Sequence, residues 1–162
     1  MINRYAKPLM LLVALACIAL LAVGLYLQLW RDMLPCPLCI LQRYAFAVTG
    51  VLCVVTLFLP QPMLGAGAAL GSLASLAGAG IAIRHLWVKA HPTISCGIDP
   101  LETSLNKVFF AEWFPALFQA DGLCTTDYDP ILGLSIPQWA LLWFAIFVVT
   151  LGLVALRSRH AE

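Results

Sequence analysis

The sequence predicts an all-α membrane protein: a bundle of four transmembrane helices with a long periplasmic loop that carries a short interfacial helix. The chain has 162 residues, of which 62% are hydrophobic and 10% charged, whereas charged residues make up about 25% of a typical soluble domain. The hydrophobic residues gather in four stretches, each near the roughly 20 residues that a helix needs to cross a bilayer. Backbone groups in lipid must bond internally, so we expect four helices in one membrane domain, residues 1–162.

The first two apolar stretches are separated by a short loop. We expect spans at residues 9–29 and 40–59, joined by residues 30–39. The first stretch is longer than the apolar core of a signal peptide and is not followed by a convincing cleavage site. We therefore expect it to remain in the protein as a span.

The third span, residues 64–83, is predicted to pair with the second as an antiparallel hairpin. The link between the two is short and consists of Pro60, Gln61, Pro62 and Met63. Small residues recur every four positions along the third span, at Gly67, Gly71, Ser75 and Ala79. Such a face lets a neighbouring helix approach closely, so it indicates a packing seam.

The last connection, residues 84–135, precedes the fourth span at residues 136–156 and is the only long segment outside the spans. Residues 105–115 of this connection are rich in Phe and Trp, which favour the membrane surface. We expect a short helix there, either lying in that surface or packed on the ends of the spans.

Four of the six cysteines lie in two loops on one side of the predicted bundle. Cys36 and Cys39 are in the first connection, and Cys96 and Cys124 are in the third. The two sides carry similar numbers of Lys and Arg, so the positive charges do not decide the orientation. Disulfides persist in oxidising compartments. We therefore expect the cysteine loops outside the cytoplasm and both termini in the cytoplasm.

The pair Cys36 and Cys39 stands where the second span begins. Pro37 favours the first helical turn, which puts Cys36 near the N-cap and Cys39 one turn further on. The partial positive charge of a helix N-terminus stabilises a thiolate and lowers the pKa of a cysteine. The pattern indicates a redox pair. Half of a zinc site, completed by Cys96 and Cys124, and a structural staple are the alternatives.

The four loop cysteines allow three pairings. We expect Cys36–Cys39 and Cys96–Cys124 disulfides in the resting oxidised form, with exchange between the loops during turnover. Four thiols on one membrane face suggest electron transfer between dithiols, with the bilayer as a source or sink of electrons.

Other polar or thiol side chains lie within or near the spans. Arg43 is one helical turn beyond Cys39, and a cation at that depth is a functional-site hypothesis; the alternative is an arginine that snorkels to the interface. His85 lies close to the same membrane face, where it either touches a ligand or is an ordinary interfacial residue. Cys17 and Cys53 lie inside the first two spans and are expected to be inert.

Together these features resemble the DsbB family of bacterial inner-membrane proteins. The resemblance covers essentially the whole chain. It rests on the four spans, the Pro-Cys-x-x-Cys pattern, the arginine four residues later, the loop cysteine pair and the stretch LGLSIPQW at residues 132–139. It implies an enzyme that reoxidises a periplasmic DsbA-like thiol oxidase and passes the electrons to membrane quinone, either ubiquinone or menaquinone.

The resemblance also implies roles for the four loop cysteines. Cys96 would be attacked by the thiolate of the partner, giving an intermolecular mixed disulfide. Cys124 would then exchange with Cys36. Cys39 would become the thiolate that faces the quinone.

The implied quinone site includes Arg43 and, as the nearest match to a histidine of the family, His85. The implied partners are the DsbA-like oxidase, the quinone pool and the lipid bilayer, with no metal. A net charge of +1 without a basic run gives no reason to expect nucleic acid.

Three alternatives stay open at the level of the sequence. One is a paralogue that serves a dedicated thioredoxin-like partner. Another is an enzyme similar to vitamin K epoxide reductase, which the early position of the CxxC disfavours. The third is a structural or metal-binding membrane protein with four spans.

Overall fold

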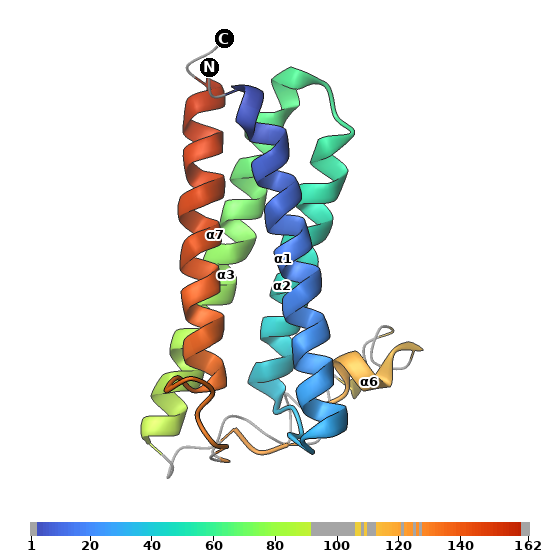
Figure 1. Ribbon diagram of the computed structural model, residues 1–162, viewed down its shortest axis with the longest axis vertical. Helices are drawn as coiled ribbons and strands as arrows, with labels where there is room; N and C mark the ends of the chain where they lie inside the picture. Colours follow the sequence, from blue (N-terminus) through green and yellow to red (C-terminus); the bar gives the residue numbers. More distant parts are fainter. Residues whose placement is uncertain are drawn as a thin grey trace.

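The predicted four-helix bundle is confirmed. The computed structural model describes residues 3–91, 106–107, 109, 113–120, 122–124, 126 and 128–159. Within this part of the chain, four helices are long and apolar enough to cross a membrane. They are α1 (Asn3–Trp30), α2 (Pro37–Leu57), α3 (Leu64–Ala90) and α7 (Ile136–Arg159). The helices run alternately up and down, and the two ends of the chain lie at the same end of the bundle (Figure 1).

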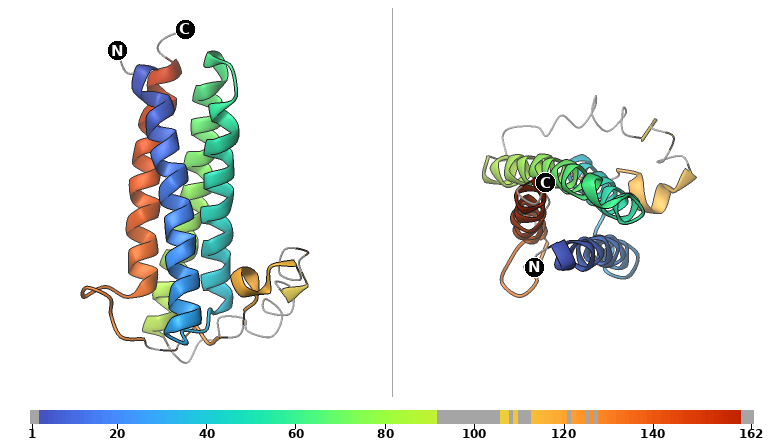
Figure 2. Two further views of the ribbon diagram at one scale, coloured as in Figure 1. Left: turned by 45° about the vertical axis from the view of Figure 1, so that its right-hand side comes forward. Right: turned by 90° about the horizontal axis from the view of Figure 1, so that it is seen from above.

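The four helices of the bundle do not pack on one another to the same extent. Helix α3 packs most extensively on α7 and then on α2, whereas α1 packs mainly on α2 and touches α7 only slightly (Figure 2). In the interior, the ring of Phe46 on α2 stacks on Phe144 of α7 with centroids 4.0 Å apart. Phe147, one turn further along α7, meets the same ring edge-on at 6.2 Å. Aromatic side chains thus fill the middle of the bundle.

The small residues of α3 form the packing seam that their spacing predicts. Gly67, Gly71, Ser75 and Ala79 are all buried. The Ser75 hydroxyl lies 3.3 Å from the hydroxyl of Thr49 on α2 and donates to the Gly71 carbonyl oxygen at 2.9 Å. Close approach of the two helices therefore also satisfies the polar groups between them.

The observed helix α3 is longer than the predicted third span. A short 3₁₀ turn, Gln61–Met63, makes the tight link to α2, as expected, but α3 then continues to Ala90 instead of ending at residue 83. The reason is burial beyond the predicted end, because His85 is only 3% exposed and Val88 only 1%. Packing on the neighbouring helices therefore continues beyond the predicted span.

Residues 132–139 lead into α7, and several of their side chains form hydrogen bonds at the start of this helix. The side-chain oxygen of Gln138 accepts hydrogen bonds from the backbone N–H and the hydroxyl of Ser135, at 2.7 and 3.0 Å. The indole N–H of Trp139 donates to the carbonyl oxygen of Ile131 at 2.8 Å. Because the first N–H groups of a helix lack intrahelical partners, these bonds fix where α7 begins.

A small helix lies beside the bundle at the end opposite the chain termini, which we call the cysteine end (Figure 1). This helix, α6 (Pro115–Phe118), has four residues, and the Phe118 ring stacks on Tyr44 of α2 at 4.5 Å. The Asn106 side chain bonds to both backbone groups of Ala120, at 2.9 and 3.1 Å. Within the expected surface helix, residues 105, 108 and 110–112 lie outside the described residues, so this helix stays a prediction.

Candidate active site

The pair Cys36 and Cys39 opens α2 as predicted. Cys36 is the N-cap residue, with extended backbone angles, and Pro37 occupies the first helical turn. The backbone N–H of Cys39 donates to the Cys36 sulfur at 3.3 Å. A backbone donor that would otherwise lack a partner therefore holds one sulfur above the helix end.

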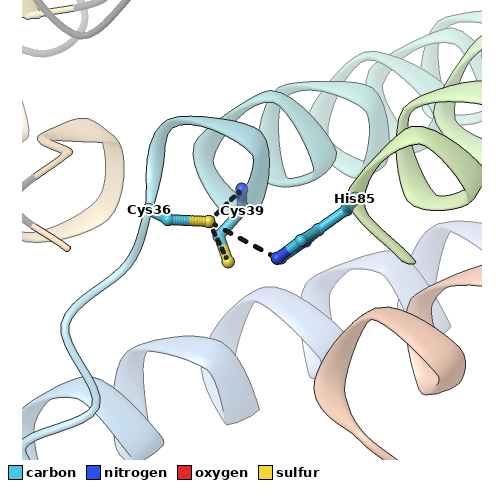
Figure 3. Close-up of side chains that lie close together, drawn as sticks. All are labelled: Cys36, Cys39 and His85. Carbon is cyan, nitrogen blue, oxygen red and sulfur yellow. Dashed lines mark hydrogen bonds between the residues drawn. The ribbon is translucent and has the colours of Figure 1, made fainter. Parts of the chain in front are cut away.

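The two sulfurs are 3.0 Å apart and form a hydrogen bond, with Cys36 as the donor (Figure 3). A disulfide bond would bring them to about 2.05 Å, and both cysteines are free thiols here. The structure thus shows the reduced pair where we expected the oxidised one. The two residues lie at the predicted positions, and only their oxidation state differs from the expectation.

The pKa of the Cys36 thiol is raised, contrary to the expected effect of the helix N-terminus. Its hydrogen bond to Cys39 is the main cause, and burial adds to it. In this hydrogen bond Cys36 carries the shared proton and Cys39 is the acceptor.

His85 reaches the same pair from α3. Its Nε2 lies 3.7 Å from the Cys36 sulfur (Figure 3). Its Nδ1 lies 3.3 Å from the side-chain amide nitrogen of Gln42, one turn into α2. Both polar residues are buried, with exposures of 3% for His85 and 4% for Gln42. The ring is therefore fixed from both sides.

The Arg43 guanidinium joins three segments of the chain. Its Nη1 donates to the Gln28 side-chain oxygen at 2.8 Å and to the Leu117 carbonyl oxygen at 2.9 Å. Its Nη2 donates to the Gly24 carbonyl oxygen at 3.1 Å. Arg43 thus ties α2 to α1 and α6, a pattern that a side chain reaching out to the interface would not show.

One cavity of about 460 Å³ brings most of the predicted site residues together at the cysteine end. Its lining is mostly apolar and comes from α1, α2, the end of α3, the start of α7 and the segment before α7. The predicted site residues that line it are Cys36, Cys39, Arg43, His85 and Cys124. Neither Cys17 nor Cys53 lines it; both are buried in the hydrophobic core of the bundle.

Cys124 lies against the CxxC pair. It is disulfide-bonded and only 2% exposed, and it packs in one apolar cluster with Cys36, Leu38 and Val88. Cys96, the remaining predicted site residue, lies outside the described residues. The structure therefore brings three of the four predicted redox cysteines to one place.

The loop carrying Cys124 is held directly on the loop carrying Cys36. The backbone N–H of Gly122 donates to the carbonyl oxygen of Pro35 at 3.1 Å. A side-chain carbon at Gly122 would overlap the carbonyl oxygen of Leu34, so glycine permits this close approach. The Tyr128 hydroxyl donates to the same Leu34 oxygen at 3.3 Å, and burial raises the pKa of Tyr128.

Sequence reasoning missed Gln42 and Gly122. A signal existed for Gln42, because a polar side chain within an apolar span marks a functional candidate and this one lies a helical turn from Cys39. No signal identified the role of Gly122, since its contacts are with Leu34 and Pro35, which are far away in the sequence.

Comparison with known proteins gives a consistent result. The family model described as "Disulfide bond formation protein DsbB" matches residues 6–154. A protein of Herminiimonas arsenicoxydans named "Disulfide bond formation protein B" is 58% identical over 96% of this chain and 99% of its own length. A protein of the same name from Burkholderia thailandensis is 45% identical, over 94% of this chain and 91% of its own. "Disulfide bond formation protein B 1" of Pseudomonas syringae pv. syringae is 40% identical, over 97% and 94%.

Proposed function

Because this chain belongs to the DsbB family of disulfide bond formation proteins, we propose that it reoxidises a periplasmic DsbA-like thiol oxidase and passes the electrons to a membrane quinone. The chain is a multi-pass membrane protein and a thiol oxidoreductase. The route from DsbA through DsbB to quinone is known to keep the bacterial periplasm oxidising. Per turnover, the partner dithiol becomes a disulfide and the quinone becomes a quinol, so two electrons and two protons move.

The observation that carries this proposal is the shared cavity at the cysteine end. Cys124 belongs to the cysteine pair that would react with the partner, and Cys39 belongs to the pair that would reduce the quinone. Both residues line this cavity. Its apolar lining and its volume of about 460 Å³ suit the ring of a lipid-soluble quinone. The thiol relay and a hydrophobic electron acceptor can therefore come into contact within one cavity.

The relay begins with the pair Cys96 and Cys124. The thiolate of the partner attacks the Cys96 sulfur of a Cys96–Cys124 disulfide, which releases Cys124 as a thiolate. The disulfide bond of Cys124 and the free thiols at four other cysteines support this pairing, because Cys96 is the sixth cysteine of the chain.

The second exchange takes place between the loops. The Cys124 thiolate attacks Cys36 in the oxidised Cys36–Cys39 pair, and Cys39 leaves as a thiolate. The packing of Cys124 and Cys36 in one apolar cluster supports this direction of attack. The assignment of Cys39 as the thiolate agrees with the hydrogen bond in which Cys39 is the acceptor.

The second thiol of the partner then frees Cys96 from the mixed disulfide, and Cys96 re-forms its bond to Cys124 and releases Cys36. In the last step, the reduced Cys36–Cys39 pair would supply two electrons to the quinone as its own disulfide re-forms. Arg43 lies one helical turn beyond Cys39 and lines the cavity. A guanidinium has five N–H donors, and the three bonds to protein oxygens leave two for a quinone oxygen. His85 also lines the cavity, but its polar contacts are with Cys36, Gln42 and the backbone of Cys124. We therefore assign the quinone to Arg43 first.

The test is anaerobic reduction of added quinone by a reduced DsbA-like dithiol, with and without this protein. We expect quinol to form only when the protein is present, with one partner disulfide per quinol. Ubiquinone and menaquinone should be supplied in parallel, which identifies the preferred acceptor. Equal rates with and without the protein would refute the proposed function.

The cysteine roles can be tested in the same assay. Cys96→Ser should block the entry of electrons while leaving the Cys36 and Cys39 thiols titratable. Cys17→Ala and Cys53→Ala serve as matched controls and should turn over at nearly the natural rate. A span cysteine as necessary as Cys96 would show that redox and inert thiols are wrongly assigned.

A further inference from the structure

The reduced pair and His85 together form a cluster with the composition of a metal site. The Cys36 sulfur, the Cys39 sulfur and one ring nitrogen of His85 all lie within 4.8 Å of one another. The three side chains come from two helices and converge on one point at the cavity wall (Figure 3). Two thiolates and an imidazole are ligands that zinc prefers.

The spacing of the ligand atoms is close to that of a tetrahedral zinc site. With bonds of about 2.3 Å to sulfur and 2.0 Å to nitrogen, two ligand atoms on one ion lie roughly 3.5–3.8 Å apart. The distance from the Cys36 sulfur to His85 Nε2 is 3.7 Å. The two sulfurs, now 3.0 Å apart, must separate by less than about 1 Å. A small rotation of one cysteine side chain provides that change.

The second nitrogen of His85 has a buried polar neighbour that can orient the ring. A ligating histidine normally bonds through its other ring nitrogen to a fixed acceptor, which sets the tautomer and orients the ring. Here Nδ1 lies 3.3 Å from the buried side-chain amide of Gln42. The oxygen and nitrogen of such an amide exchange places by a half turn, so Gln42 can accept the Nδ1 proton. The ring also hydrogen-bonds to the backbone of Cys124, and Nε2 must carry no proton in order to bind an ion.

We propose that the reduced form of this chain binds one Zn²⁺ ion through Cys36, Cys39 and His85. The fourth position faces the cavity, where a water molecule completes the tetrahedron. Both thiols lose their protons on binding, and no electrons move. Two thiolates balance the charge of the ion.

This site exists in only one oxidation state of the protein. A Cys36–Cys39 disulfide has no thiolate to offer, so oxidation removes two of the three ligands. Conversely, a bound ion holds both sulfurs and prevents them from forming the disulfide. That second effect rests on the proposed function, whereas the binding itself does not.

The experiment measures Zn²⁺ binding directly, without quinone or partner. Full-length protein carrying Cys96→Ser and Cys124→Ser is reduced, freed of reductant and titrated with Zn²⁺ against a chromophoric chelator. We expect one ion per reduced chain and none per chain after chemical oxidation of the Cys36–Cys39 pair. Equal binding in the two oxidation states, or no binding to the reduced chain, would overturn the proposal.

Variants then test the ligand set. In the same background, Gln42→Ala should weaken binding about 10- to 100-fold, as loss of a group that orients a metal ligand does. His85→Ala should weaken it at least as much. The matched control is His91→Ala, because His91 is the C-cap residue of the same helix and is exposed. The side chain of His91 hydrogen-bonds only to the Trp87 carbonyl oxygen among the contacts described. Unchanged affinity in His85→Ala, or equal loss in His91→Ala, would remove His85 from the site.

A spectroscopic measurement keeps the proposal testable if a variant folds poorly. Co²⁺ added to the reduced protein should give the absorption of a tetrahedral ion with sulfur ligands, and Zn²⁺ should displace it. The intensity of the sulfur-to-cobalt band should fall by about half in Cys39→Ser, which keeps one thiolate. An octahedral spectrum would exclude the site. Because neither measurement involves turnover, its failure is distinguishable from failure of the proposed function.

Discussion

At the scale of single residues, the site depends on contacts between loops that are far apart in the sequence. Gly122 allows one loop to lie on the carbonyl groups of Leu34 and Pro35, and this brings Cys124 to Cys36. Exchange between two sulfurs requires them to meet in a defined geometry. The rate of exchange should therefore be more sensitive to this backbone contact than the stability of the bundle is.

Gly122→Ala tests that dependence. The added methyl group would overlap the Leu34 carbonyl oxygen, so the loop must move away. Because a misplacement of about 1 Å can lower a rate roughly 100-fold, we expect exchange between Cys124 and Cys36 to slow by one to two orders of magnitude. Stopped-flow trapping of the inter-loop disulfide measures it. Asp129→Ala, at an exposed position of the same loop, is the control; slowing in both variants would contradict the specific role of Gly122.

Arg43 makes the second prediction at this scale. If it binds quinone, Arg43→Ala removes a charge-assisted hydrogen bond worth roughly 1.5–3 kcal/mol, and the apparent KM for quinone should rise about tenfold or more. Arg43→Lys should be intermediate, because lysine keeps the charge without the planar fork. Steady-state kinetics against quinone concentration measures both.

The Arg43 variants also lose contacts that have nothing to do with quinone. The bonds to Gln28, Gly24 and Leu117 join three segments, so the kinetics must be compared at matched folded content. Gln28→Ala is the control, because it removes one of these bonds and keeps the guanidinium. A KM that does not change in Arg43→Ala would remove Arg43 from the quinone site.

The sequence predicted individual residues well where one helix determines their position. The places of Cys36, Cys39 and Arg43 follow from an N-cap and one helical turn, and the structure has them there. Two other features depend on contacts that the sequence alone does not reveal. The contact of His85 with Cys36 depends on how α3 lies on α2, and the raised pKa of Cys36 depends on a hydrogen bond that outweighs the helix end.

At the scale of the elements, α3 divides into two functional parts. Its first part carries the small residues that pack on α2 and α7, and its last turns carry His85 to the cysteine pair. Hydropathy predicted the first part, since that stretch is apolar. It could not predict the second, because burial of a polar residue depends on a partner on another helix, here Gln42.

Gly78→Ala tests the packing of α3 on α7. A side-chain carbon at Gly78 would overlap the buried ring of Phe144, which is itself stacked on Phe46. Overfilling a packed core costs typically about 1–3 kcal/mol. We therefore expect a lower midpoint of thermal unfolding in detergent.

The matched control for Gly78→Ala lies two positions along the same helix. A side-chain carbon at Gly80 would meet no other atom within 4 Å, so Gly80→Ala should leave the midpoint unchanged or raise it slightly, as alanine favours helix over glycine. A destabilised Gly80→Ala with an unaffected Gly78→Ala would reverse the assignment of the packed face.

At the scale of the whole molecule, the bundle has two different ends. Both chain termini lie at one end, and the cavity with its cysteines lies at the other (Figure 1). The parity of four spans predicted this separation from the sequence. We propose that the cysteine end faces the periplasm because disulfides persist in oxidising compartments. The positive charges are similar on the two sides and do not decide the orientation.

Reporter fusions test the orientation. A reporter that works only in the cytoplasm should be active at the C-terminus, and a reporter that works only in the periplasm should be inactive there. Fusion of the same reporters after residue 91, with the rest of the chain removed, should give the opposite pattern. Activity of the periplasmic reporter at the C-terminus would contradict the predicted topology.

The stacked rings in the middle of the bundle have a consequence for the compartments on either side. Phe46 both lines the cavity and lies flat on Phe144 in the core of the bundle. In the orientation that we propose, these packed rings lie between the cysteine pair and the reducing cytoplasm. The rings then help to keep two thiol pools of very different redox potential separate, although one small protein is exposed to both.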